Sequence, residues 1–464
     1  MSRMMQRIQS LFKPMDLSQG SCWRTILRFS LPIILSYLLQ QVYSISDAAI
    51  VGQTLASTDV AGVNDTQSLI FIFLQFAFGV SAGFCVITSR HAGAHDEAGV
   101  RRSLATQIVL SAVLTILLTA LAMALLNPLL AWIHVTPDQG DVYRAAHTYC
   151  AIIFCGIGAQ LFYNFICSFL RSIGDSVTPL AFLLFSTLLN VALDLLFVIV
   201  FKMGVAGVAI ATSLAQLASG LLVCWSLMRS KECYRLELKK LRIQRQVMRD
   251  TIRIGLPTGL QSMMYTLSNM IITTAINGFG TSVAAAWVVL GKLDGMNWMI
   301  VNAFGVAVMT FAGQNFGARR YDRVEKSMYV CVAMSMGTAI VMGASFMIFA
   351  RPLFRLFTRD AIVLEKAVEM VRFMGFCYWL YIPIEMISGT LRGMGDALIP
   401  TAITVIGICA LRAVWVFAVV PVWHTEAAIM CSYPISWVLC SVTFVFYYRR
   451  YRRTHFPCIE GERA

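Results

Sequence analysis

The chain has 464 residues, of which 58% are hydrophobic and only 13% charged, and its formal net charge is +13. A typical soluble domain carries about twice that fraction of charged residues, so the composition excludes an ordinary soluble globular protein. The 13 cysteines show no spacing typical of a disulfide framework or a zinc site.

Residues 1–24 are basic and lack the apolar core and small-residue cleavage site of a signal peptide, so we expect a cytoplasmic arm. Twelve apolar runs follow, each long enough to cross a bilayer as a helix. The alternating pattern of an outer-membrane barrel is absent. The predicted spans are centred on 27–51, 66–89, 104–126, 146–170, 178–201, 204–228, 254–276, 283–312, 328–350, 368–391, 398–422 and 425–448.

The twelve predicted helices fall into two groups of six, which a basic stretch separates. We therefore expect an all-α polytopic membrane protein with an N-terminal lobe at 25–228 and a C-terminal lobe at 254–448. A cytoplasmic linker at 229–253 joins the lobes, and a cytoplasmic tail at 449–464 ends the chain.

The basic residues follow the predicted topology. Of 37 Lys and Arg residues, 28 lie in the termini and the even-numbered loops, seven lie in or beside odd-numbered loops, and two lie inside predicted helices. The positive-inside rule then places both termini and the linker in the cytoplasm. One cluster, from Arg351 to Lys366, falls on the outer side and departs from this pattern. We expect the lipid bilayer, and not nucleic acid, to be the partner of this basic chain.

One ten-residue sequence motif, which we call the repeated phrase, occurs twice. LRSIGDSVTP at Leu170–Pro179 returns as LRGMGDALIP at Leu391–Pro400, with identical Leu, Arg, Gly, Asp and Pro, and Pro32 has a counterpart in Pro257. Because an even number of helices separates the copies, they are parallel repeats related by an axis along the membrane normal. In each half the phrase closes the fourth helix and opens the fifth. We expect it to cap and turn the chain there.

Polar residues occur at helical spacing inside two predicted helices of the first half. A spacing of i, i+3, i+7 places side chains on one helix face, and a carboxylate within the membrane is costly enough to indicate function. The two sets are Gln40, Tyr43 and Asp47 in the first helix, and Thr187, Asn190 and Asp194 in the fifth.

With these features together, the chain resembles the multidrug and toxic compound extrusion (MATE) family. The resemblance rests on LR..GD....P in both halves, the paired prolines, GQNFGA after the eighth predicted helix and the loop pattern. It implies two pseudo-symmetric six-helix lobes in a V around a central cavity. It also implies export of amphiphilic, often cationic small molecules in exchange for H+ or Na+. We expect a monomer of the bacterial inner membrane that needs no cofactor.

In the DinF-like branch of that family, which the chain resembles, an Asp of the first helix and an Asn-x-x-x-Asp pair of the fifth form the cation site. The matching ion-coupling residues here are Asp47, Asn190, Asp194 and Thr212. The expected cavity residues are Gln40, Tyr43, Tyr149, Asn164, Tyr265 and Glu385. Leu411 and Trp415 replace the Asn and Asp in the second half, so only the N-terminal lobe is expected to bind the ion.

Several roles stay open at this level. Glu385 is either a substrate-facing acid or the partner of Arg412, and Lys292 and Asp294 each need a separate partner because i, i+2 positions diverge on a helix. Gln40, Tyr43, Tyr149 and Asn164 fit interhelical hydrogen bonding as well as ligand contact. Pro32 deletes a helix hydrogen bond and is a candidate hinge.

Two other functional classes are less consistent with the sequence. A flippase for a lipid-linked pyrophosphate would favour a cavity rich in Lys and Arg, whereas only Lys292 and Arg412 lie inside the predicted helices. An enzyme is disfavoured because HExxH and GxSxG are absent. No GxxxxGK[ST] loop for ATP occurs, so the energy for transport is expected to come from an ion gradient.

Overall fold

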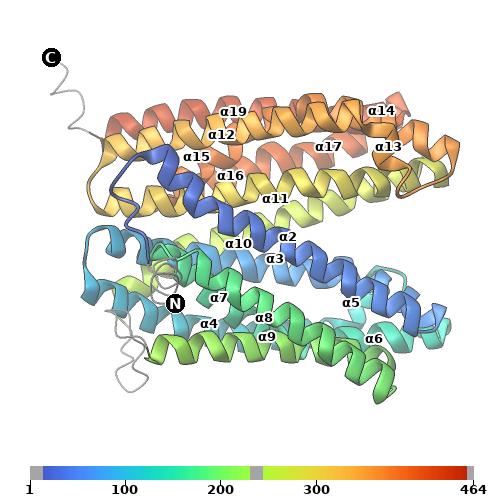
Figure 1. Ribbon diagram of the computed structural model, residues 1–464. Helices are drawn as coiled ribbons and strands as arrows, with labels where there is room; N and C mark the ends of the chain where they lie inside the picture. The colour runs from blue at the N-terminus through green and yellow to red at the C-terminus, as the bar shows by residue number, and fades with distance from the viewer. Residues whose placement is uncertain (1–13, 230–243, 457–464) are drawn as a thin grey trace, which may run out of the picture. The chain divides into compact units, whose positions relative to one another are not determined.

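The computed structural model describes residues 14–229 and 244–456. Most of the expected N-terminal arm, the centre of the basic linker and the end of the tail lie outside the described residues. Within the two described ranges the regular structure is entirely helical, and no strand occurs (Figure 1). The all-α prediction is confirmed.

The described residues of the first half form eight α-helices, a 3-10 turn and a π-helical segment, some of which follow one another within a single membrane span. In chain order they are α2 (Cys22–Thr54), α3 (Ser57–Gly93), α4 (Glu97–Ala124), α5 (Leu126–Trp132), η1 (Pro137–Gln139), α6 (Asp141–Cys155), α7 (Ile157–Ser172), α8 (Val177–Asp194), η2 (Leu195–Val200) and α9 (Gly204–Arg229).

The second half repeats this order. Its elements are α10 (Arg245–Asn277), α11 (Thr281–Gly317), α12 (Tyr321–Ile348), α13 (Ala350–Phe354), α14 (Ala361–Cys377), η4 (Tyr378–Leu380), α15 (Ile382–Gly393), α16 (Leu398–Thr404), η5 (Val405–Ala410), α17 (Leu411–Ala418), α18 (Val420–Trp423) and α19 (Glu426–His455). The helices α3 and α11 both have 37 residues and start at positions 224 apart, which follows the predicted repeat.

Every predicted span overlaps one helix or a run of consecutive helical segments. Among the described residues ten spans are long and apolar enough to cross a membrane, and the pair α6 and α7, bent by 45°, makes an eleventh. The remaining predicted span, 254–276, lies in α10, which is helical but less apolar. Its apolar run is interrupted by the polar side chains of Gln261, Ser262, Thr266, Ser268 and Asn269.

The described chain forms two compact units. The first contains Leu31–Met263 with the described residues up to Asp16, and the second contains Leu17–Ser30 with the described residues from Met264 onward. Each long first helix is therefore shared, because the beginning of α2 belongs to the second unit and the beginning of α10 to the first. Pro32 is the second residue of the part of α2 that belongs to the first unit.

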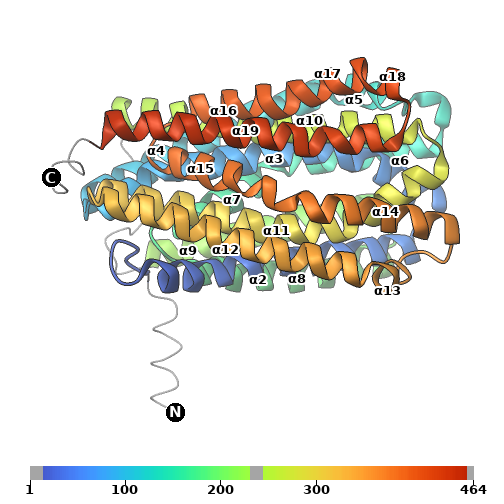
Figure 2. The ribbon, with the colours of Figure 1, turned by 90° about the horizontal axis from the view of Figure 1, so that it is seen from above.

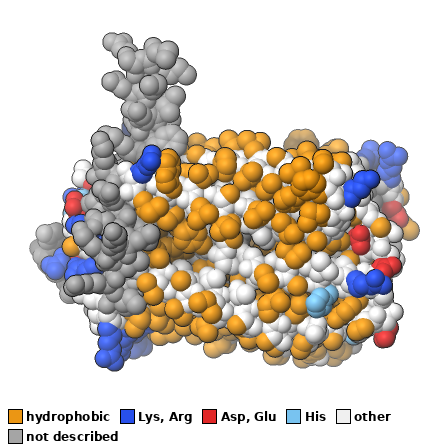
Figure 3. Space-filling view, turned by 90° about the horizontal axis from the view of Figure 1, so that it is seen from below, with side chains coloured by type: hydrophobic (Ala, Val, Ile, Leu, Met, Phe, Trp, Pro, Cys, Tyr) orange, Lys and Arg blue, Asp and Glu red, His pale blue; other side chains and the backbone are white. Residues whose placement is uncertain are grey.

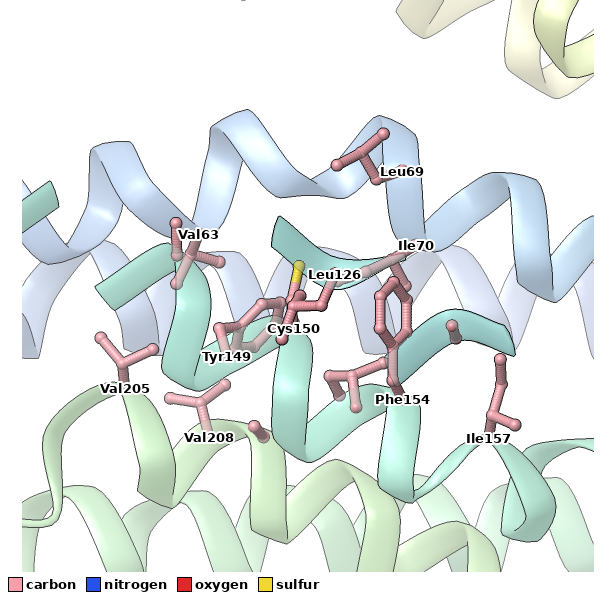
Figure 4. Packing of buried hydrophobic residues seen from close by; sticks show 14 of the residues in the cluster. Val63, Leu69, Ile70, Leu126, Tyr149, Cys150, Phe154, Ile157, Val205 and Val208 are labelled. Atoms are coloured by element: carbon pink, nitrogen blue, oxygen red, sulfur yellow. The ribbon is translucent and has the colours of Figure 1, made fainter. Parts of the chain in front are cut away.

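In the first unit, α3, α6 and α9 meet around a buried apolar cluster. Figure 4 shows Val63 of α3, Tyr149 of α6 and Val208 of α9 gathered with Leu126 and Phe154 between these helices. Inside a membrane such packing stabilises chiefly through van der Waals contact, because lipid tails are as apolar as the side chains. The cluster fixes α6 against α9, which carries part of the polar site described below.

In the second unit, α11, α12, α14, α15 and α19 run side by side (Figures 1 and 2). The loop between α11 and α12 holds residues 17–20, the segment before α2, which we call the strap. Gln314 Oε1 accepts a hydrogen bond from Leu17 N, at 3.1 Å, and Asn315 Nδ2 donates to Leu17 O. Arg320 donates to Ser18 O, and Arg323 donates to the carbonyl groups of residues 17, 19 and 20. These bonds satisfy the backbone oxygens of the strap.

The repeated phrase builds the turn that its residues predicted. Asp175 Oδ1 accepts hydrogen bonds from the N–H groups of Val177 and Thr178, at 3.1 and 2.9 Å, and so caps the start of α8. Gly174 adopts φ +95°, and its counterpart Gly395 adopts φ +93°, a conformation that side chains with a Cβ rarely tolerate. The predicted turn is confirmed in both copies, and the predicted capping is confirmed in the first.

The outer surface carries a broad apolar region. On the face in Figure 3, hydrophobic side chains cover the middle and charged side chains gather toward the two ends. Large apolar side chains such as Ile116, Phe417 and Phe446 are about two-thirds exposed or more. A soluble monomer does not expose apolar patches of this extent, whereas a bilayer covers them.

Candidate functional site

The polar face of α2 contributes Tyr43 and Asp47 to the first unit. Tyr43 OH donates a hydrogen bond to Thr212 Oγ1 of α9, at 3.3 Å. Asp47 lies one turn further along the same face and is half-buried. The contact fixes the relation between α2 and α9 at this depth, as the predicted convergence of these residues requires.

The helix α8 contributes the most deeply buried members of the site. Asn190 and Asp194 are fully buried, and Asn190 Nδ2 donates to Thr212 Oγ1 at 3.5 Å. Thr187, the third polar residue of this face, returns its hydroxyl to Leu183 O within its own helix. Thr212 therefore accepts from both Tyr43 and Asn190 and links the three helices α2, α8 and α9.

The two acids face each other. The carboxyl groups of Asp47 and Asp194 lie within hydrogen-bonding reach. Four buried oxygens accept no hydrogen bond from the described part of the chain. They are both carboxylate oxygens of Asp194, Asp47 Oδ1 and Asn190 Oδ1. Ionised carboxylates only accept hydrogen bonds, so two of them side by side need a proton or a metal cation between them. These four buried acceptor oxygens without a donor are the candidate site for a proton or a cation.

The predicted lining residues are distributed unevenly around this group. Tyr149 of α6 is buried and lies close enough to Asp47, Tyr43 and Asp194 to interact with them electrostatically. Gln40 is exposed and Asn164 of α7 is half-buried, and neither donates to the acids. The structure therefore brings together Asp47, Asn190, Asp194, Thr212, Tyr43 and Tyr149.

Two further features lie beside the expected ion-coupling residues. Gln216 lies one turn beyond Thr212 on α9, and its Oε1 is buried with no donor among the described residues. The π-helical segment η2 begins directly after Asp194. A π-helical turn is wider than an α-helical turn and is frequent at functional sites. Gln216 was recognisable from its spacing to Thr212, whereas η2 has no sequence signature.

The second unit has no equivalent pair of acids at the repeat-related positions. Leu411 and Trp415 stand where the first unit has Asn190 and Asp194, and Ile272, at the position of Asp47, is fully buried. Trp415 Nε1 donates to Ala428 O of α19 at 2.8 Å, which ties α17 to α19. These contacts are structural, and this asymmetry matches the one expected from the sequence.

Glu385 belongs instead to a buried polar chain in the second unit. Tyr381 OH donates to Glu385 Oε2 at 3.0 Å and lies 3.1 Å from Tyr265 OH. Arg392 Nη2 lies 3.2 Å from Glu385 Oε1, and both side chains are nearly buried. The partner of Glu385 is therefore Arg392 and not Arg412, because α15 places them two turns apart on one face.

Arg412 lies in a separate aromatic cluster. Its guanidinium carbon lies 4.0 Å from the ring centroid of Tyr433, and its Nε donates to Ser436 Oγ at 3.1 Å. Asp294 accepts from Trp298 Nε1 at 2.8 Å and lies close enough to Arg412 to attract it. Lys292 is exposed and forms no ion pair within the described ranges. Asp294 of α11 and Arg412 of α17 thus attract each other without forming an ion pair among the described residues.

Comparison with known proteins gives a consistent result. The MatE family profile matches residues 32–196 and 257–417, one segment in each half of the chain. The chain is 28% identical over 441 residues to "Probable multidrug resistance protein YpnP" of Bacillus subtilis (strain 168), covering 94% of this chain and 97% of that protein. It is 25% identical over 440 residues to "Probable multidrug resistance protein YoeA" of the same organism, covering 93% and 94%.

Among solved structures, one described as an "Outward-facing conformation of a multidrug resistance MATE family transporter of the MOP superfamily" superimposes with a TM-score of 0.86. The match covers 95% of this chain and 99% of that one at 19% sequence identity. At this identity the likeness shows a common fold.

Proposed function

The chain belongs to the MatE family of multidrug and toxic compound extrusion transporters, and on that premise we propose that it is a secondary active efflux antiporter. As a member of this family it is a multi-pass membrane transporter and not an enzyme. It exports amphiphilic, often cationic compounds in exchange for H+, with Na+ as the alternative ion. The multidrug names of the relatives from Bacillus subtilis support this substrate class.

The facing carboxyl groups of Asp47 and Asp194 carry the proposal. When both are ionised, two negative charges in a buried site hold a cationic substrate or demand another cation. A proton arriving from outside neutralises one carboxylate and lets it donate a hydrogen bond to the other. Protons and cationic substrate therefore compete for the same charge, which is the requirement for antiport. The pair titrates as a unit.

The neighbouring residues position this pair. Thr212 and Asn190 hold α8 against α9, and Tyr43 fixes the face of α2 that carries Asp47. Pro32 weakens α2 because it lacks an N–H, and we propose that α2 bends there when Asp47 changes its charge. We propose Gln40, Asn164 and Tyr149 as substrate contacts of the first unit, and Tyr265 and Glu385 as substrate contacts of the second.

Sodium is the rival coupling ion because its ligands are present. Carboxylate, amide and hydroxyl oxygens suit a hard cation, and Asp47, Asp194, Asn190 and Thr212 offer all three kinds. The absence of an acid pair at Leu411 and Trp415 supports a single coupling site, in the N-terminal lobe. This arrangement corresponds to the DinF-like branch.

We propose the bacterial inner membrane as the location, with a monomer as the working unit and both termini in the cytoplasm. The lobes are 25–228 and 254–448, joined by the linker at 229–253, and the basic arm at 1–24 and tail at 449–464 face inward.

Everted membrane vesicles test the function and the ion together. Uptake of a fluorescent lipophilic cation into the vesicles is measured with an imposed proton gradient alone, then with a sodium gradient alone. Uptake driven by the proton gradient in vesicles with the protein, and not in vesicles without it, supports H+ antiport. Uptake driven only by sodium reassigns the ion. No uptake with either gradient contradicts the proposed function.

A further inference from the structure

Two arginines at equivalent positions of the repeat have different surroundings. Arg171 ends α7 in the first unit, and Arg392 ends α15 in the second, and both are more than nine-tenths buried. Arg392 donates to Ser388 O and pairs with Glu385. Arg171 has no hydrogen bond or ion pair with any described residue, and its Nε is buried without a partner. The described part of the first unit therefore lacks a counter-ion that the second unit contains.

The repeat shows which group is missing. The counterpart of Glu385 is Asn164, an offset of 221, so the first unit has an amide where the second has a carboxylate. Gly305 of α11 faces Glu385 closely, since a Cβ added to it would lie 2.6 Å from Glu385 Oε1. The counterpart of Gly305, at the offset of 224, is Ser81. Ser81 is 1% exposed, and its Oγ has no partner among the described residues.

These unmatched donors come from two helices that pack against each other. As α11 packs on α15 in the second unit, α3 packs on α7 in the first. Cys85 follows Ser81 by one turn on α3 and lies near Arg171, as do Tyr163 and Cys167 of α7. Ser81 and Arg171 thus flank one region of the α3–α7 interface from opposite sides.

The described acids of the first unit form no ion pair with Arg171, although Asp175, like Arg171, lies near Cys167. Asp175 is the acid that follows Arg171 most closely in the chain, and its Oδ1 accepts from Val177 N and Thr178 N. Asp175 forms no ion pair with Arg171 within the described ranges. A buried guanidinium is stable only with a counter-ion and hydrogen-bond acceptors. The buried Nε of Arg171 has no such acceptor among the described residues, and an anion from outside would supply one.

We propose that Ser81, Asn164 and Arg171 form an anion site for one monovalent, carboxylate-sized anion. The guanidinium, the hydroxyl and the amide are all hydrogen-bond donors. The anion takes the place that the carboxylate of Glu385 has in the second unit. Its source is either a free ion such as chloride or the acidic group of a transported molecule. This site goes beyond the proposed antiport, since it needs no gradient and no coupling residue.

The binding test uses the purified full-length protein. Its thermal unfolding midpoint is measured in sodium chloride and in sodium gluconate at equal ionic strength, because gluconate is too large for the space of one carboxylate. A ligand that binds only the folded state raises the midpoint with concentration. We expect a chloride-dependent rise in the wild type, a reduced rise in Ser81→Ala and none in Arg171→Gln. If the wild-type midpoints in the two salts are identical, chloride does not bind the folded protein, and the proposal is overturned.

Asn164→Glu provides the sharpest variant. It gives Arg171 a carboxylate at the position that Glu385 has relative to Arg392, so a side chain of the protein takes the place of the bound anion. We expect a higher midpoint than the wild type in gluconate and no further rise in chloride. A chloride response as large as that of the wild type would show that the anion binds elsewhere. In the converse variant, Glu385→Gln, loss of the internal carboxylate should create an additional chloride response at Arg392.

The source of the anion is separated by transport. Uptake of a fluorescent amphiphile that carries a carboxylate is compared with uptake of its methyl ester in everted vesicles. If the site receives the acid group of a substrate, Arg171→Gln lowers uptake of the acid more than uptake of the ester. If the anion is a free ion, the ratio of the two uptakes is unchanged while the chloride response in unfolding is lost.

Discussion

The carboxyl groups of Asp47 on α2 and Asp194 on α8 lie within hydrogen-bonding reach of each other, although they are 147 positions apart in the chain. Neither oxygen of Asp194 receives a hydrogen bond from any described residue. Since ionised carboxylates only accept hydrogen bonds, one proton held between the two groups removes their charge repulsion and supplies a hydrogen bond between them. This relationship generates the first prediction.

Asp47→Asn and Asp194→Asn should each reduce gradient-driven uptake in everted vesicles to the level of vesicles without the protein. An amide has nearly the size of the carboxyl group but does not titrate, so the coupling charge is lost while insertion is preserved. Asp141→Asn is the matched control, because Asp141 pairs with Arg144 at the exposed surface. Uptake is normalised to folded protein. Full coupling in both Asp variants would place the ion site elsewhere.

Leu411→Asn combined with Trp415→Asp should leave the number of ions exchanged per substrate unchanged. These changes copy the polar residues of α8 into α17, but Ile272 still occupies the position of Asp47. The Trp415 hydrogen bond to Ala428 O is lost, so a lower unfolding midpoint is expected. Stoichiometry is measured from the gradients that balance at zero net flux. A doubled value would contradict the one-lobe assignment.

Glu385→Ala should destabilise the protein far more than Glu365→Ala. The pair of Glu385 and Arg392 is nearly buried, and removing one partner of a buried pair costs about 3–5 kcal/mol. The pair of Glu365 and Arg351 is more than half exposed, and surface pairs contribute about 0–1 kcal/mol. Both free energies of unfolding are measured by denaturant titration in the same detergent. Equal losses would show that Arg392 finds another acceptor.

Gly174→Ala should destabilise more than Gly140→Ala. Both glycines have positive φ, which costs other residues roughly 1–2 kcal/mol. A Cβ at Gly174 would also collide with the backbone oxygen of Met15, whereas a Cβ at Gly140 meets open space. The unfolding midpoint of each variant is measured, and the difference between the two shifts gives the effect of the contact with Met15. Equal shifts would mean that the Met15 segment moves away without cost.

Asp96→Ala should lower stability near neutral pH and have little effect in acid. A hydrogen bond from Gly99 N, with His91 and Arg102 nearby, lowers the pKa of Asp96. A carboxyl group with a lowered pKa stabilises the fold above its unfolded pKa, and this contribution is lost as pH falls through its folded pKa. The expected loss at neutral pH is roughly 0.5–2 kcal/mol, the usual effect of an N-cap.

The control for this prediction is Asp138→Ala, since Asp138 lies on the exposed 3-10 turn η1, with no side-chain cap there. Its effect on stability should be small at every pH. If wild type and Asp96→Ala differ equally at neutral and acid pH, the aspartate acts through packing and not through its charge.

Helical spacing was sufficient to predict most of the site. The period of the α-helix places Tyr43 and Asp47 on one face of α2, and Asn190 and Asp194 on one face of α8. Because polar side chains are costly to expose to lipid, the two faces are expected to turn toward each other. The twelve spans followed from the length of apolar runs. The capped turn after Arg171 was predictable from Gly174 and Asp175, because glycine adopts positive φ in tight turns and aspartate caps the start of a helix.

Other features depend on packing between segments distant in sequence. The bend between α6 and α7 falls at Gly156, where a Cβ would meet Ser213 Oγ of α9, a contact that no local pattern reveals. The pairing of Glu385 with Arg392 was missed because Arg392 belongs to a phrase with an evident structural role. The π-helical segments η2 and η5 arise from one locally wider turn, for which residue composition gives no signal.

The strap has a consequence for how the protein is made. Residues 17–20 leave the ribosome before Arg320 and Arg323, which bind their carbonyl groups and follow about 300 residues later. At about 5–20 residues per second, roughly 15–60 s of synthesis separate the two. The strap therefore waits without these partners until Arg320 and Arg323 emerge. The second unit is complete only when the chain closes this long loop between the strap and its partners.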